Sequence, residues 1–189
     1  MYIVRKVAPV MRIRGHRVLA AAAIGIVWLS FACIPAVAAD AGKSPPVKIA
    51  VFDFELDDVS PAASVPGGST SSAAVMEKVT SAARRILVQS GRYSLIDVSK
   101  ADAKPMTEKL LRNCNGCEAG IALQLGADES LLGVVRKASM TDYYVLIQIS
   151  DARTGKVLTQ EAANFAGGDD AWASGVVSLI RHQVLAVQN

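Results

Sequence analysis

The sequence predicts an α/β (α+β) domain in which helices pack on a mixed sheet of about five strands. Three observations predict it. A nearly continuous apolar run at 47–54 is typical of a strand that is covered on both faces. Apolar residues at helical spacing follow this run, and beyond residue 128 the period changes from helical to alternating. The expected order is β-α-β-α-α-β-β-β-α, ending in an antiparallel meander and a C-terminal helix.

Residues 1–38 predict a secretory signal peptide that is cleaved from the domain. A basic start precedes an unbroken apolar run at 18–34, and residues 35–39 (PAVAA) supply an Ala-x-Ala exit, so we expect cleavage after Ala38. Met11 is an alternative start to Met1. Two alternatives to a cleaved signal also stay open. The apolar run could remain as a membrane anchor, although it is shorter than the roughly 20 residues of a span and Pro35 breaks it. Cys33 could be a lipoprotein acylation site, although bulky Phe31 fits that signal poorly.

The charge of the chain depends on this segment. The whole sequence has 20 basic and 17 acidic residues, and five of the basic residues but no acid precede Ala38. The mature chain then has 15 basic against 17 acidic residues, a net charge of −2. The basic balance belongs to the signal and predicts no nucleic-acid binding. The expected domains are the signal at 1–38, a polar leader at 39–46 and a single α/β domain at 47–189.

The first half of the domain predicts two strands and three helices. We expect a strand at 47–54, a Ser/Pro/Gly-rich loop at 57–70, and a helix that Ser71 or Ser72 caps and Gly91 ends. That helix has an apolar face of Val75, Val79, Ala82, Ala83 and Ile86. A strand at 93–98 follows, then a short helix that begins near Pro105. After a corner at 113–116, Glu118 opens another helix, which ends at Gly126.

The second half predicts the meander and the last helix. Alternating segments at 129–137, 143–151 and 157–165 read as three strands. The segment at 151–156 predicts a hairpin turn, with Gly155 at positive φ. Asp169 and Asp170 begin a helix whose apolar stripe is Trp172, Val176, Leu179, Ile180, Val184 and Val187.

Cys114 and Cys117 form the most distinctive local motif, NCNGCE. In an exported chain this spacing favours a structural disulfide at a helix corner. The alternative is thiol–disulfide exchange, because a helix N-terminus can hold a low-pKa thiolate. Zinc would need two more strong ligands, and haem attachment would need a histidine in place of Glu118. We expect His182 to be a solvated surface histidine.

Four carboxylates form a second candidate site. Asp53, Glu55, Asp57 and Asp58 lie at and beyond the carboxyl end of the first strand, where ligands bind in α/β sheets. Asp53 and Glu55 project from one face if the strand continues. A cation or ligand site is one interpretation, and a solvated strand end leading into a polar loop is the other.

The segments VKIAVFDF, SGRYSLID, LGADESLLGVV and DARTGKVL resemble the amino-terminal α/β domain of TolB and its relatives over about residues 47–165. The combination of VFDFEL, SGRYSLID, NCNGCE and LGAD is similar to a family of small secreted bacterial proteins known as a domain of unknown function. The resemblance implies a fold and an envelope location, with no activity. TolB makes its partner contacts through a β-propeller that we do not expect here, so those partners do not carry over.

These observations favour a periplasmic, non-catalytic binding or accessory module whose meander edge or acidic loop meets an envelope protein partner. The alternatives are a thiol–disulfide oxidoreductase using Cys114 and Cys117, and a metal-dependent enzyme at the Asp53–Asp58 cluster. We expect no cofactor, no nucleic acid and no membrane contact except through the signal segment before its cleavage.

Overall fold

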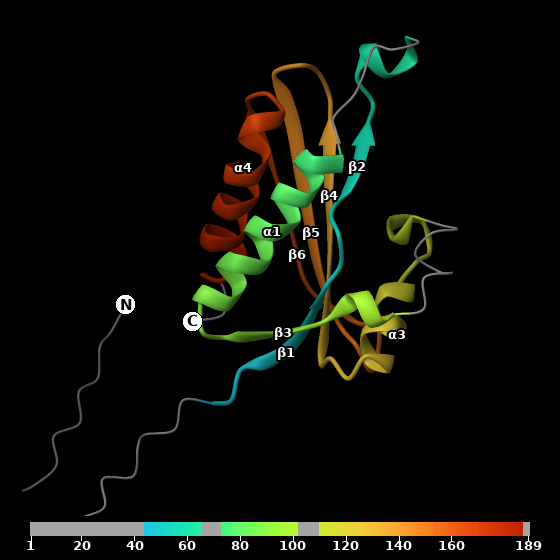
Figure 1. The fold of residues 1–189 in the computed structure, drawn as a ribbon, viewed down its shortest axis with the longest axis vertical. Coiled ribbons are helices and arrows are strands. Elements are labelled where there is room, and N and C mark those ends of the chain that lie inside the picture. The colour runs from blue at the N-terminus through green and yellow to red at the C-terminus, as the bar shows by residue number, and fades with distance from the viewer. Residues whose placement is uncertain (1–43, 66–72, 102–109, 187–189) are drawn as a thin grey trace, which may run out of the picture. The chain divides into compact units, whose positions relative to one another are not determined.

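The structure is a computed structural model that describes residues 44–65, 73–101 and 110–186. Figure 1 shows a mixed sheet with helices on it. The expected signal at 1–38, the caps at Ser71 and Ser72, the helix at Pro105 and the end of the last apolar stripe at Val187 lie outside the described residues. Within the described part of the chain, no helix combines the length and apolar character needed to cross a membrane.

The sheet has six strands, one more than expected, in the order β3-β1-β4-β5-β6, with β2 beside β4. The strands are β1 (Val47–Val51), β2 (Glu55–Asp58), β3 (Tyr93–Ile96), β4 (Glu129–Lys137), β5 (Asp142–Asp151) and β6 (Val157–Ala166). Strand β1 runs parallel to both β3 and β4, whereas β4, β5 and β6 pair antiparallel. The predicted meander is confirmed to within one residue at each strand end.

The prediction of one continuous strand at 47–54 is wrong, because the strand is interrupted after Val51. Val51 pairs with Leu131 and Glu55 pairs with Val134, so β1–β2 advances four residues while β4 advances three. One extra residue therefore sits in this strand, as in a β-bulge. Because side chains alternate between faces, the extra residue reverses the alternation. Phe52 packs in the core on one face of the sheet and Phe54 packs in the core on the other.

Helices cover both faces. Helix α1 (Ala73–Gln89) and helix α4 (Trp172–Leu179), which continues as one π-helical turn (Ile180–Val184), lie side by side on one face (Figure 1). Helix α3 (Cys117–Gln124) packs against β4 from the other face. Gly91, Gly126 and Gly155 all have positive φ, at the two helix ends and the hairpin turn where the sequence predicts them.

Two apolar cores result. The larger lies under α1 and α4, where Trp172, Leu179 and Leu87 meet Ile49 and Ile147 of the sheet. The smaller lies under α3. It consists of Ala50, Phe52, Leu111, Ile121, Ala122, Ala127, Leu132 and Ala152. Each face of the sheet therefore has its own packed layer, and any surface site belongs to one layer or the other.

Candidate functional site

The cysteine pair lies at the corner that leads into α3. Cys114 and Cys117 form a disulfide with their Cα atoms 5.6 Å apart. Cys114 follows a short 3₁₀ turn (Leu111–Asn113), and α3 begins at Cys117. Between the cysteines, Asn115 and Gly116 both adopt positive φ, 54° and 98°, and this tight reversal brings the two sulfurs together. The structure thus contains the disulfide that the spacing predicts.

Glu118 is a site residue that the sequence did not reveal. It is the second residue of α3, and only 1% of it is exposed. Its Oε1 accepts a hydrogen bond from Nε2 of Gln148 on β5 at 3.3 Å. Its Oε2 is buried and has no hydrogen-bond partner among the described residues. The sequence marks Glu118 only as an acid that opens a helix, whereas the fold places its carboxylate against Gln148 of β5.

The surroundings of Glu118 compensate its carboxylate poorly. Removing a carboxylate from water costs several kcal/mol even after relaxation. The helix N-terminus returns about 0.3–1 kcal/mol, and a hydrogen bond to a charged group about 1.5–3 kcal/mol. No basic side chain pairs with Glu118 in the described parts of the chain. The carboxylate is therefore a group with unused capacity to bind a cation or a donor.

Cys114, Cys117 and Glu118 also form a potential metal-ligating group. Their ligand atoms lie within 4.8 Å of one another, and no other such group occurs among the described residues. Zinc binds the thiolate form of cysteine, whereas these sulfurs are joined to each other. In the disulfide form the group thus offers a single carboxylate.

The acidic segment does not act as one cluster. Asp53 pairs with Arg84 of α1 at 2.9 Å and lies on the side of the larger core. Glu55, only 11% exposed, turns to the opposite side. There its Oε2 pairs with Arg112 at 2.9 Å, and its Oε1 accepts the backbone N–H of Leu111. The extra residue between β1 and β2 separates the two carboxylates, so they do not share a face.

The other two acids are also engaged. Asp57 pairs with Arg136 at 2.7 Å and with Arg112 at 3.7 Å. Asp58 accepts hydrogen bonds from the backbone N–H and the hydroxyl of Ser60, at 3.0 and 2.6 Å. Glu55 and Asp57 thus share Arg112, and the segment acts as an arginine clamp on the 3₁₀ turn rather than as an open ligand set.

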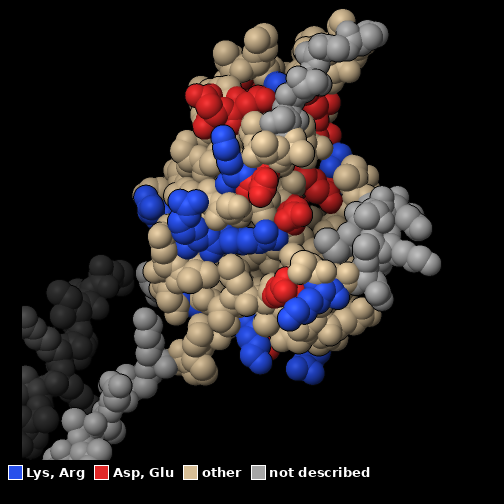
Figure 2. All heavy atoms as spheres, in the orientation of Figure 1, with Lys and Arg blue, Asp and Glu red and all other residues tan. Residues whose placement is uncertain are grey.

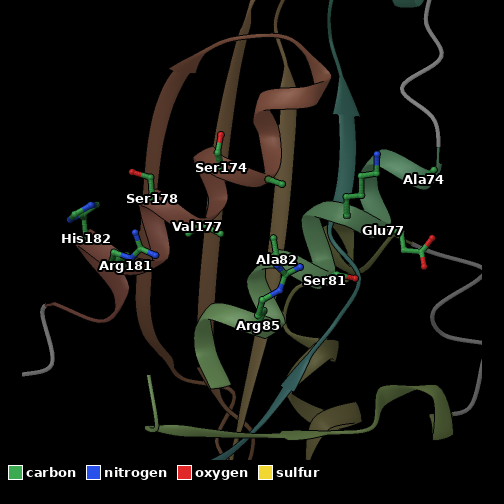
Figure 3. A pocket seen from close by; sticks show the side chains of 12 residues that line it. Ala74, Glu77, Ser81, Ala82, Arg85, Ser174, Val177, Ser178, Arg181 and His182 are labelled. Atoms are coloured by element: carbon green, nitrogen blue, oxygen red, sulfur yellow. The ribbon is translucent and has the colours of Figure 1, made fainter. Parts of the chain in front are cut away.

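A groove of about 800 Å³ lies between α1 and α4 (Figure 3). Small side chains make up most of its lining, namely Ala74, Ser81, Ala82, Ala173, Ser174, Val177 and Ser178. The two helices run parallel, because Lys78 shares a cleft with Asp169 at one end and Arg85 shares one with Arg181 at the other. A partner segment lying in the groove would thus contact both helices along their length.

The groove is charged unevenly. Arg85 and Arg181 are exposed at its far end and make no ion pair or hydrogen bond with the described residues, and His182 lies beside them, exposed as predicted (Figure 3). The C-termini of the two parallel helices together contribute a partial charge of about −1 at this end. With the two arginines, the net charge there is roughly +1. In Figure 2, basic side chains form a band across the middle of this face and acidic ones gather towards the top.

The family model DUF3280, described as "Protein of unknown function (DUF2380)", matches residues 47–184. The chain belongs to this family. Membership in a family of unknown function was the expectation from the NCNGCE-containing sequence, and it is confirmed. No curated protein matches the DUF3280 chain in sequence.

Several solved structures resemble the DUF3280 chain weakly. The LpoB C-terminal domain from Escherichia coli is 14% identical, with 62% of this chain and 81% of that chain covered and a TM-score of 0.46. The PelC dodecamer from Paraburkholderia phytofirmans is 17% identical, with 72% and 83% covered and a TM-score of 0.45. TolB from Acinetobacter baumannii is 16% identical, with 75% and 29% covered and a TM-score of 0.42. A TolB structure is thus among the similar ones, and we draw nothing further from these likenesses.

Proposed function

We propose that this DUF3280 protein is a non-catalytic binding module of the bacterial envelope that holds an acidic segment of a partner protein in the α1/α4 groove. The groove itself carries the proposal, because it is about 800 Å³ in volume and has at one end two arginines that make no ion pair with the described residues. The signal-like residues 1–38 support an exported location, and disulfides persist in oxidising compartments.

The dimensions of the groove fit a short segment. From Ala74 to Arg85 the groove follows α1 for three turns, about 16 Å at 1.5 Å per residue. This length accommodates about three turns of a partner helix or about five residues of an extended chain. Alanine and serine along the floor allow close approach, because the distance between packed helices depends on the size of the side chains at the contact.

The charges fix which end of the segment lies where. Arg85 and Arg181 can each bind a carboxylate with two parallel hydrogen bonds. Because both are exposed, each ion pair contributes only about 0–1 kcal/mol. Complementary charges mainly raise the association rate and set orientation, so burial along Ala82 and Val177 supplies most of the affinity.

The test is site-specific photo-cross-linking in envelope preparations. A photoreactive residue at Ser81 in the groove should give a discrete cross-linked partner, whereas one at Leu123 on α3, which is 42% exposed, should not. Combining Arg85→Glu with Arg181→Glu should remove the Ser81 product and leave the fold intact. Equal cross-linking from Ser81 and Leu123 would contradict the proposal. So would a Ser81 product of unchanged yield in the Arg85→Glu, Arg181→Glu double variant.

A second candidate docking surface is the outer edge of β6. This strand has ten residues and pairs only with β5 among the described strands, so its outer backbone groups can accept a partner strand. In that case a photoreactive residue at Gln160 on β6 would cross-link instead of one at Ser81.

The oxidoreductase alternative has one observation in its favour, namely that Cys117 begins α3. It stays a prediction that a redox titration can decide. The metal-dependent alternative has no such support among the described residues, because Asp53, Glu55 and Asp57 are paired with arginines and Asp58 with Ser60.

A further inference from the structure

We propose that the cavity beside the disulfide corner binds an alkylammonium group, with Glu118 as its counter-charge. This inference does not rest on the α1/α4 groove. The groove lies over the larger core, whereas Glu118 belongs to α3 on the opposite face of the sheet. The two proposals can therefore fail separately.

The cavity lies between the corner and the meander. It has a volume of about 270 Å³, and Glu118 and Gln148 line it. Three neighbouring strands contribute apolar side chains to its wall, namely Leu132, Val134, Leu146 and Val157, and the corner contributes Arg112 and Asn115. At the packing density of protein interiors, this volume holds roughly ten non-hydrogen atoms. A ligand with a short hydrocarbon body fits these walls.

The electrostatics of the cavity select a cation. Oε2 of Glu118 is buried without a hydrogen-bond partner among the described residues. Arg112 also lines the cavity, but its guanidinium pairs with Glu55 at 2.9 Å and with Asp57 at 3.7 Å. Glu55 and Asp57 neutralise the positive charge of Arg112, so Arg112 does not balance the negative charge of Glu118. An anionic ligand would meet this carboxylate, and a neutral hydrocarbon would leave it unpaired.

Among cations, the walls favour an organic one. Calcium takes six to eight oxygen ligands, and magnesium keeps near-octahedral coordination. Glu118 is the one carboxylate in this lining, and apolar side chains of three strands share the cavity with it. An ammonium group on an alkyl chain matches both features, because its three N–H donors suit a carboxylate and its hydrocarbon chain suits the apolar side chains. Such a group can belong to a free aliphatic amine or to a lysine side chain of a peptide.

The experiment compares matched probes on the folded protein by amide chemical shifts in NMR spectroscopy. Pentylamine, which is protonated at pH 7, is titrated against 1-pentanol, which has the same chain length and no charge. We expect pentylamine to bind at least tenfold more tightly than 1-pentanol, with shifts at Glu118 and Leu146. Nα-acetyl-lysine methylamide is a third probe, which represents a lysine side chain within a peptide. Tighter binding of this probe than of pentylamine would indicate a lysine side chain, and the reverse a free amine.

Two variants complete the test. Glu118→Gln keeps the size of the side chain and should reduce pentylamine binding to the level of 1-pentanol. Val157→Trp, at a position that is 43% exposed, should block the cavity mouth and abolish binding of both probes while Glu118 stays in place. If wild-type protein binds neither probe at about 10 mM, or binds both equally, the proposal is overturned. Unchanged pentylamine affinity in Glu118→Gln would overturn it as well.

Discussion

Two glycines in helices provide a matched test of how closely the helices pack. Gly175 is the fourth residue of α4 and Gly120 the fourth residue of α3, and each helix has eight residues. Glycine to alanine in an exposed helix interior normally stabilises a protein by about 0.5–1 kcal/mol. A Cβ at Gly120 would meet no atom within 4 Å. We therefore expect Gly120→Ala to raise the free energy of unfolding by that amount.

Gly175→Ala should instead lower the free energy of unfolding. A Cβ at Gly175 would lie 3.0 Å from Cε2 and Cζ of Tyr143, and closer still to its hydroxyl oxygen. Tyr143 cannot easily move, because it is 3% exposed, stacks on Phe165 at 5.5 Å and donates its hydroxyl to the carbonyl of Ala171 at 3.0 Å. Overpacking costs about 1–3 kcal/mol and a lost hydrogen bond about 1 kcal/mol. After subtracting the helix gain, we expect a net loss of about 1–3 kcal/mol.

Urea unfolding of the two variants measures both values, and a double-mutant cycle identifies the cause. Tyr143→Phe removes the nearest clashing atom, so Gly175→Ala should cost less in that background, with a coupling energy of about 1 kcal/mol. If Gly175→Ala proved as stabilising as Gly120→Ala, α4 would have room to move outward. The tight contact between α4 and Tyr143 of the sheet would then be refuted.

Two further predictions concern the disulfide and a buried acid. A structural role for Cys114–Cys117 predicts a reduction potential below about −300 mV in a glutathione or dithiothreitol titration, and a value well above this would favour the oxidoreductase. Burial raises the pKa of Glu129, and Asp128 and Asp151 add to the shift, so its contribution to stability is present below pH 4.5 and lost as pH rises through the raised pKa. Glu129→Gln should thus gain stability over wild type between pH 4 and pH 8 in urea unfolding, whereas a pH-independent difference would contradict this.

The meander could be predicted from sequence because its signal is local. The alternation that marks 129–137, 143–151 and 157–165 repeats every two residues, and the turn at Gly155 needs only its own backbone freedom. The break after Val51 could not be predicted in this way. VKIAVFDF reads as one strand, and the extra residue becomes visible only against its partner β4, 80 residues further along the chain.

The candidate sites also divide into features that neighbouring residues encode and features that depend on distant segments. The spacing of Cys114 and Cys117 was sufficient to predict their disulfide. Glu118 looked like an ordinary helix-opening acid, and its hydrogen-bond partner Gln148 lies 30 residues away on β5. The groove was also hidden, because the apolar stripes identify the inner faces of α1 and α4. Which outer faces lie side by side is decided by the order of the strands beneath them.

The extra residue between β1 and β2 links the two layers of the molecule. Through Asp53 the segment contacts Arg84 of α1, and through Glu55 it contacts Arg112 on the opposite face. The first pair is exposed at Asp53 and contributes at most about 1 kcal/mol. Glu55 is largely shielded from solvent and accepts hydrogen bonds from both the backbone of Leu111 and Arg112, so it holds the turn that precedes the disulfide more firmly. The disulfide fixes residues 114–117 among themselves, whereas Glu55 attaches the turn just before them to the sheet.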